Sequence, residues 1–214
     1  KIEASAQTNK LQTKFVNIAT GGASGPYNVI GTSLAEIYNK TYGVNSKTQT
    51  TGASVENLNL LKQNKVEMAF VMSDSLTEAL NGTGSFKDAK IENVQQISAL
   101  YPNYVQIVTS KKTGIKNIED LKGKRIAVTK GSSAHNFLAE TLKKANLTWD
   151  DIQPIWLSPA DARAALDKKA VDAWAIWEPY ISATELNGSA NNIFDSTELQ
   201  DTYAFYSAQP KFIQ

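Results

Sequence analysis

The chain has 214 residues, 42% of them hydrophobic and 20% charged, with a formal net charge of +1 at pH 7. This size and composition predict a globular protein of one or two domains, and the near-neutral charge excludes a global field that would recruit nucleic acid or an acidic membrane. The lack of cysteine excludes disulfides, thiolate metal sites and cysteine catalysis, and no apolar run approaches the roughly 18 residues of a membrane-spanning helix.

The first segment, residues 1–14, is polar and shows no periodic pattern. We interpret it as a tail, left either by removal of a signal peptide or by cloning. The first interpretation predicts an exported protein, located in the periplasm or outside the cell. It also allows a lipid anchor carried by a removed N-terminal region.

A glycine-rich turn between a strand and a helix is the first candidate binding element. Residues 15–19 alternate apolar and polar side chains, which predicts a strand. A helical stripe follows the turn and consists of Tyr27, Ile30, Leu34, Ile37 and Tyr38. Such a turn aims backbone N–H groups and the positive end of the helix dipole at an anion or a carbonyl oxygen, although it also serves simply to reverse the chain. The candidate ligand contacts are Gly22, Ala23, Ser24, Gly25 and Tyr27.

The same pattern occurs again about 105–110 residues later. RIAVTKGSS at 125–133 repeats FVNIATGGA at 15–23, and LDKKAVDAWAI at 166–176 repeats LKQNKVEMAFV at 61–71. Each copy of the second pair contains a helix end, a polar turn, one apolar residue, one acid and a buried strand. We therefore predict two α/β lobes whose strand-end turns face each other across a cleft, with Ser132 and Ser133 as candidate ligand contacts in the second lobe.

Several turn and capping signals divide the rest of the first half. Residues 46–51 alternate weakly and predict a strand, and Ser54 is the expected cap of the next helix. Residues 66–72 are apolar enough for a central parallel strand. Ser73 and Asp74 follow it, either as plain helix caps or as ligand contacts at the strand's carboxyl end, and the helix they begin is expected to stop at Asn81–Gly82.

The second half begins with an alternating run at 104–109 that carries the chain into lobe two. A first run at 96–100 and Tyr101, a candidate ligand contact, precede it. Asn117 is expected to cap a short helix that ends at Gly123. Further helix starts are predicted at Thr148 and Ser158, each with an acid three residues later. Residues 202–207 alternate again and predict a second crossing between the lobes.

Four side chains near the second glycine turn and strand admit two interpretations each. His135, the only histidine, either forms a local hydrogen bond at its helix start or contacts a ligand. Trp174 and Trp177 lie on opposite sides of an extended strand, and each either packs in the core or forms a pocket wall. Glu178 either accepts a hydrogen bond from a ligand or caps Tyr180. No histidine cluster exists for a metal, and no base–nucleophile pair predicts catalysis.

The first half resembles the TAXI family, the receptors of TRAP transporters. The motifs that carry this resemblance are ATGGASGPY at 19–27, TGASVEN at 51–57, NGT at 81–83 and LYP at 100–102. The family commonly has a second tyrosine and a proline where Asn28 and Val29 stand here. The resemblance covers residues 15–125 and implies glutamate-like carboxylates as ligands.

The second half, residues 120–206, resembles the aliphatic sulfonate binding proteins of ABC importers. KGSSAH at 130–135, DIQP at 151–154, SPADARAA at 158–165 and DAWAIWEPY at 172–180 carry this resemblance, which implies alkanesulfonate ligands. The last motif usually has aspartate where Glu178 stands. DLKGKR at 120–125 is common to both families and forms the seam of a chimera, natural or constructed.

Both resemblances imply the two-lobed type II periplasmic-binding-protein fold, of class α/β. We expect lobe one at 15–103 plus 206–214 and lobe two at 104–205, with lobe one incomplete at its C-terminus and hence able to self-associate. The predicted function is capture of a small organic anion in the interlobe cleft for the membrane permease of a TRAP or ABC transporter, with no cofactor, no metal and no nucleic acid. The alternatives are a recombinant chimeric scaffold without ligand binding and, third, an enzyme or effector domain on the same fold.

Overall fold

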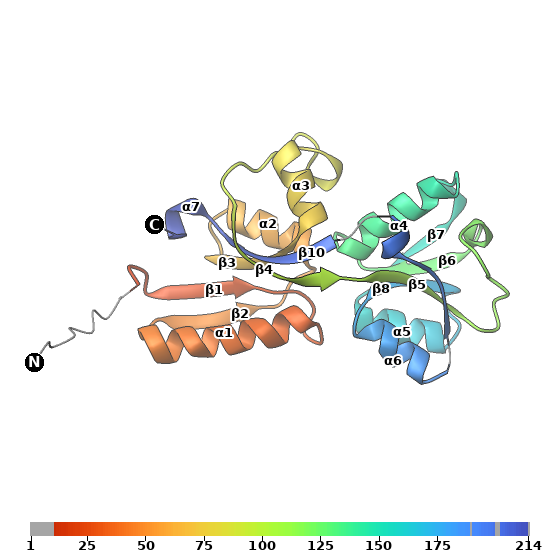
Figure 1. Cartoon of the computed structure of the whole chain (residues 1–214), viewed down its shortest axis with the longest axis horizontal. Helices are drawn as coiled ribbons and strands as arrows, with labels where there is room; N and C mark the ends of the chain where they lie inside the picture. Colours follow the sequence, from red (N-terminus) through yellow and green to blue (C-terminus); the bar gives the residue numbers. More distant parts are fainter. Residues whose placement is uncertain (1–10, 189, 200–201, 214) are drawn as a thin grey trace, which may run out of the picture.

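A computed structural model describes residues 11–188, 190–199 and 202–213, which form two five-stranded sheets set end to end (Figure 1). The predicted polar tail therefore lies mostly outside the described residues. The first sheet has the order β2 (Asn45–Gln49), β1 (Phe15–Ala19), β3 (Met68–Met72), β10 (Thr202–Ala208), β4 (Gln95–Asn103). The second sheet has the order β7 (Gln153–Trp156), β6 (Arg125–Val128), β8 (Ala173–Trp177), β5 (Val105–Ser110), β9 (Ala190–Asp195).

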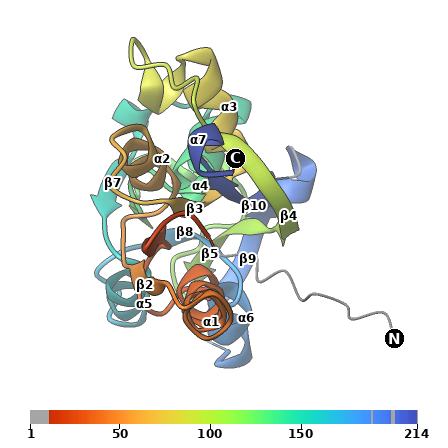
Figure 2. The ribbon, with the colours of Figure 1, turned by 90° about the vertical axis from the view of Figure 1, so that its left-hand side faces the viewer.

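Helices cover both faces of each sheet (Figures 1 and 2). In the first lobe they are α1 (Pro26–Tyr42) on one face and α2 (Ser54–Lys62) and α3 (Ser73–Asn81) on the other, with α7 (Pro210–Ile213) at the end of the chain. In the second lobe they are α4 (Ser133–Lys144) on one face and α5 (Pro159–Asp167) and α6 (Tyr180–Leu186) on the other. Short 3-10 helices are η1 (Gly84–Phe86), η2 (Glu119–Leu121), η3 (Trp149–Asp151) and η4 (Ser196–Glu198). Among the described helices, none has the length and apolarity to cross a membrane.

The predicted duplication is present in the sheets. In the first lobe β1 pairs in parallel with β2 and β3, and in the second lobe β6 pairs in parallel with β7 and β8. The repeated acid has the same role in both copies, because Glu67 accepts the backbone N–H of Asn17 at 2.6 Å and Asp172 accepts that of Arg125 at 2.9 Å. Glu67 thus links the start of β3 to β1, and Asp172 links the start of β8 to β6. The predicted two-lobed α/β fold is confirmed.

Two connections join the lobes, and one of them differs from the prediction. The first passes from β4 through Tyr104 to β5, as expected. The second was expected near Phe205, but β10 pairs along its length with β3 and β4 of the first sheet. The crossing therefore lies before Thr202, and residues 202–205 belong to the first sheet. The alternating pattern predicted a strand correctly but carries no information on which sheet the strand joins.

Some local predictions of helix geometry also need correction. Ser54 is the first residue of α2 rather than its cap; the cap is Ala53, and the Ser54 hydroxyl accepts the N–H of Met72 at 3.0 Å. Ile37, placed on the buried stripe of α1, is exposed, because Gly31 and Ala35 form the face that packs on the sheet. The stop of α3 before Gly82 and the capping contacts of Thr148 and Ser158 are as predicted.

The ion pair at the entry of β6 gives a pH-dependent contribution to stability. Asp172 accepts Nε and Nη2 of Arg125 at 3.1 and 2.8 Å, and these hydrogen bonds lower the pKa of the Asp172 carboxyl below its ordinary 3.8. Because the folded-state pKa is lowered, the ionised carboxyl stabilises the folded state at pH values above its ordinary pKa. This contribution is lost as the pH falls through the lowered pKa. Asp172→Asn is expected to reduce the free energy of unfolding by no more than about 1 kcal/mol at neutral pH.

Urea unfolding of both proteins over a series of pH values checks this expectation. The difference in the free energy of unfolding between the Asp172→Asn variant and the native chain should shrink as the pH falls below 3.8 and disappear once the pH is below the lowered pKa of Asp172. A difference that stays constant into that range would assign the effect to packing instead of to the charge. Glu36→Gln, at an exposed helix pair with Lys40 at 3.4 Å, is the matched control and is expected to change little.

Candidate functional site

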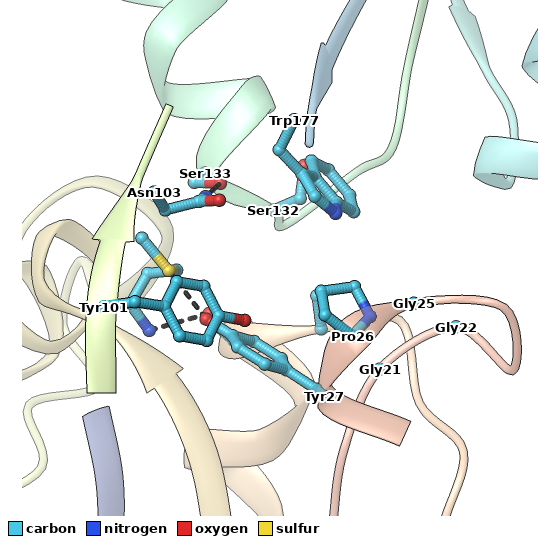
Figure 3. A pocket seen from close by; sticks show the side chains of 13 residues that line it. Gly21, Gly22, Gly25, Pro26, Tyr27, Tyr101, Asn103, Ser132, Ser133 and Trp177 are labelled. Atoms are coloured by element: carbon cyan, nitrogen blue, oxygen red, sulfur yellow. Dashed lines mark hydrogen bonds between the residues drawn. The ribbon is translucent and has the colours of Figure 1, made fainter. Parts of the chain in front are cut away.

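A pocket lies between the lobes at the end of the central strands (Figure 3). It contains about 430 Å³ of empty space, part of which is continuous with solvent. Both lobes and the first connection between them supply its walls. The lining residues are Gly21, Gly22, Gly25, Pro26, Tyr27, Ala53, Ser54, Met72, Tyr101, Asn103, Ser132, Ser133 and Trp177.

The N-termini of three helices meet at this pocket. Gly25 is the cap of α1, Ala53 the cap of α2 and Ser132 the cap of α4, and all three residues line it. The first-turn N–H groups of a helix have no carbonyl partner within the helix, and they carry the positive end of its dipole. Three such ends, two from the first lobe and one from the second, create a site suited to an anion.

Hydroxyl groups supplement these backbone donors, and no charged side chain is found among the lining residues that the structure describes. The Tyr101 hydroxyl is buried and, within the described chain, has no hydrogen-bond partner. Burial raises the pKa of Tyr101 to about 12, so the group remains a donor at neutral pH. The Ser133 hydroxyl accepts Nδ2 of Asn103 at 3.1 Å, which leaves its own hydrogen for another acceptor.

Aromatic and sulfur-containing side chains form the apolar part of the wall. Tyr27 stacks on Phe70 with ring centroids 5.0 Å apart, and its ring lies 6.4 Å from that of Tyr101. The Tyr27 hydroxyl donates to Sδ of Met72 at 2.7 Å. Burial, then the neighbouring Tyr101 and Asp74, raise the pKa of Tyr27 well above its ordinary value, which keeps the phenol neutral. Trp177 faces these groups from the second lobe (Figure 3).

Direct contacts between the lobes surround the pocket, so the structure is in a closed arrangement. The Ser24 hydroxyl lies 2.6 Å from the Tyr180 hydroxyl, and Val55 N–H donates to the Gly131 carbonyl at 3.3 Å. Gly131 has φ +75°, and glycine at this position permits the close contact with Val55, because a Cβ here would lie 3.1 Å from Cβ of Val55.

The pocket contains half of the residues predicted as ligand contacts. Gly22, Gly25, Tyr27, Tyr101, Ser132, Ser133 and Trp177 line it. Gly22 and Ser132 come from opposite lobes, so the two glycine turns do share one gap as predicted. The Ser132 hydroxyl, however, donates to the Thr129 carbonyl at 2.7 Å and caps α4, so its hydrogen is already used within the second lobe.

Four predicted contacts in the first lobe lie outside the pocket. Ala23 is exposed, and Ser24 contacts Tyr180 instead. The Ser73 hydroxyl accepts the N–H of Tyr203 at 3.1 Å, and Asp74 contacts α4. Side chains that follow a strand end point in several directions, so a position near the strand end in sequence did not place these four side chains in the pocket.

Three predicted contacts in the second lobe are also outside the pocket. His135 packs against both Trp149 and Trp156, and its Nδ1 accepts Gly131 N–H at 3.3 Å. Burial, then the neighbouring Lys130, lower the pKa of His135. Trp174 is fully buried. Glu178 accepts the backbone N–H of Ser182 at 3.1 Å and its hydroxyl at 2.9 Å. The local interpretation therefore describes His135 in this structure, and the core interpretation describes Trp174. Glu178 also forms a local contact, but its partner is Ser182 and not Tyr180 as predicted.

Sequence reasoning missed several lining residues. They are Gly21, Pro26, Ala53, Ser54, Met72 and Asn103. One signal could have identified two of them. TGAS at 51–54 is similar to TGGAS at 20–24 and also lies at a helix start, and the structure brings that helix start to the pocket. Asn103 ends β4 at the connection between lobes, a place that no local pattern identifies.

The chain matches a known family over most of its length. The NMT1-like family matches residues 18–198, a range that crosses the predicted seam at 120–125. A relative in Escherichia coli (strain K12), named as an aliphatic sulfonates-binding protein, is 48% identical over 107 residues, which are 50% of this chain and 34% of the relative. A second relative with that name, in Bacillus subtilis (strain 168), is 40% identical over 98 residues, 46% of this chain and 29% of the relative. This chain thus spans about a third of the length of the curated relatives it matches.

Two solved structures of related proteins align with almost the whole chain. The periplasmic aliphatic sulphonate binding protein SsuA from Escherichia coli has a TM-score of 0.67 at 29% identity, over 94% of this chain and 66% of that one. The alkanesulfonate-binding protein SsuA from Xanthomonas axonopodis pv. citri, bound to MOPS, has a TM-score of 0.66 at 28% identity, over 94% of this chain and 67% of that one.

Proposed function

This chain belongs to the NMT1-like family, and on that premise we propose that it is a solute-binding protein that captures a small organic anion between its lobes for delivery to a membrane transporter. One observation carries the proposal. The N-termini of α1, α2 and α4, drawn from both lobes, meet at an interlobe pocket with the Tyr101 hydroxyl, and among the described residues that hydroxyl has no partner and the lining has no charged side chain. An anion in that position binds both lobes at once and therefore stabilises the closed arrangement.

An alkanesulfonate is the ligand class that we propose. The sulfonate oxygens accept from the helix N-termini and hydroxyls, while Tyr27, Met72 and Trp177 cover the alkyl chain. A glutamate-like ligand would also bury an ammonium group, and the described lining offers no carboxylate to pair with it. The names of the relatives support the same class.

The partner and location follow from the same proposal. An exported receptor, periplasmic or extracellular, would deliver the ligand to the permease of an ABC transporter, the system of the second resemblance. The two lobes would be residues 15–103 with 202–213, and 104–199. The relatives named above are binding proteins, which fits the absence of a predicted catalytic role. A TRAP-type partner, a two-family origin, a lipid anchor and self-association stay predictions.

Titration calorimetry with ethanesulfonate, MOPS and glutamate tests the proposal. We expect saturable binding of a sulfonate and weaker or no binding of glutamate. Binding should also raise the melting temperature of the chain by mass action. Failure of every sulfonate and carboxylate to bind the folded native chain would contradict solute binding as its activity.

Tyr101→Phe is the matched variant for this titration. Removal of the hydroxyl should reduce sulfonate affinity by about 10-fold, since hydrogen bonds to charged groups contribute about 1.5–3 kcal/mol. Stability of the free chain should stay equal or rise, because the buried hydroxyl has no hydrogen-bond partner among the residues that the structure describes. Unchanged affinity in this variant would place the anion elsewhere in the pocket.

A further inference from the structure

Asp74, predicted as a ligand contact, instead faces the opposite lobe. It lies in the first turn of α3, where its Oδ1 accepts the N–H of Ser75 at 2.7 Å. Its Oδ2 accepts Nδ2 of Asn136, from α4 of the second lobe, at 3.2 Å. Neither Asp74 nor Asn136 lines the ligand pocket. The contact therefore joins the lobes without touching the position of the ligand.

The groove around this contact contains acids from both lobes. Its lining is Ser73, Asp74, Thr77, Glu78, Asn136, Ala139, Glu140 and Thr202. Glu78 belongs to α3 and Glu140 to α4, and no cationic side chain is found in the described lining. Closure thus brings carboxylates of the two lobes toward each other. The Asn136 amide is the group that supplies a donor to Asp74 from across the gap.

We propose that Asp74 and Asn136 form an interlobe positioning pair that stabilises the closed arrangement and so sets ligand affinity from outside the pocket. This inference rests on the proposed solute-binding function. Burial raises the pKa of Asp74 and outweighs the lowering effect of its hydrogen bonds from Ser75 and Asn136, so closure costs this carboxylate part of its contact with water. The Asn136 amide offsets part of that cost in the closed arrangement, and separation of the lobes removes this donor.

A set of exchanged side chains tests the pair. Asn136→Asp places two carboxylates face to face, whereas the double variant Asp74→Asn with Asn136→Asp restores one acid and one amide in reversed positions. Asn136→Ala removes the donor without adding charge. Asn191→Asp, on an exposed position of β9, adds the same charge to the second lobe away from α3 and is the matched control.

Two readouts separate this inference from the ligand proposal. Calorimetry with ethanesulfonate gives the affinity, and small-angle X-ray scattering gives the radius of gyration with and without it. We expect Asn136→Asp to lower affinity by about 10-fold or more and to enlarge the chain relative to Asn191→Asp, because loss of a charge-assisted contact is joined by like-charge repulsion. The double variant should recover most of the lost affinity, and Asn136→Ala should lie between them.

Each possible result either supports or overturns the proposed Asp74–Asn136 pair. If ethanesulfonate fails to bind the native chain, the scattering of the ligand-free variants still decides the role of the pair. Equal affinity and equal dimensions of Asn136→Asp and Asn191→Asp would overturn the inference. So would a double variant that behaves no better than Asn136→Asp. If Asn136→Asp unfolds, as judged by its thermal transition, Asn136→Ala and the double variant give the comparison.

Discussion

Replacement of Ser133 by aspartate is expected to lower sulfonate affinity by more than about 100-fold while the chain stays folded. Ser133 is the first residue of α4 and lines the pocket. A carboxylate there would compete with the ligand for the same helix N-terminus. It would also place a like charge beside the bound anion, where water is largely excluded and repulsion is strong.

The fold should tolerate this change, which makes the result interpretable. An acid in the first turn of a helix is stabilised by the helix dipole. Asn103, which now donates to the Ser133 hydroxyl at 3.1 Å, can donate to the new carboxylate instead. The melting temperature of the free Ser133→Asp variant should therefore equal or exceed that of the native chain.

Titration calorimetry with ethanesulfonate and thermal melting by circular dichroism measure both quantities. Ser133→Asn, similar in size but neutral, is the matched control and should lose much less affinity. Native-like affinity in the aspartate variant would show that the anion does not bind at the N-terminus of α4.

The second large effect separates two tryptophans that lie three residues apart on β8. Trp174 is fully buried and packs with Leu166 of α5 and Ile181 of α6. Trp174→Ala is expected to lower the free energy of unfolding by about 3–5 kcal/mol, the cost of a large cavity in a packed core. Such a loss is a large part of the total stability of a typical domain.

Trp177→Ala should show the opposite balance. Its ring is partly exposed and lines the pocket, so truncation should remove the apolar cover of the ligand and reduce affinity about 10-fold or more. The loss of stability should be smaller than for Trp174, because part of the ring is already in contact with water. Urea unfolding and ethanesulfonate calorimetry on both variants provide the test. A larger stability loss at Trp177 than at Trp174 would contradict this assignment.

These two residues also show where the sequence was informative. Alternation along a strand places side chains three residues apart on opposite faces of the sheet, so the sequence predicted that Trp174 and Trp177 have different surroundings. It could not decide which of the two faces the cleft. That choice depends on which face of the second sheet α5 and α6 cover.

The first lobe shows the same limit. Phe15–Ala19, the glycine turn and the start of α1 are local features, and short-range periodicity predicted all of them. Ser24 and Asp74, two positions expected to touch the ligand, instead contact Tyr180 and Asn136 of the other lobe. Their partners are 156 and 62 residues away along the chain, so no local pattern contains that information.

The sequence by itself therefore determined the α/β class, the duplicated strand–turn–helix unit and the two glycine turns that meet at the pocket, because each follows from periodicity or from chain reversal over a few residues. Only the tertiary structure decided which sheet the last strand joins, which side chains near each turn enter the pocket, and which of them join the lobes. Those features arise from the packing of helices on sheets and from the approach of one lobe to the other, where residues distant in sequence become neighbours.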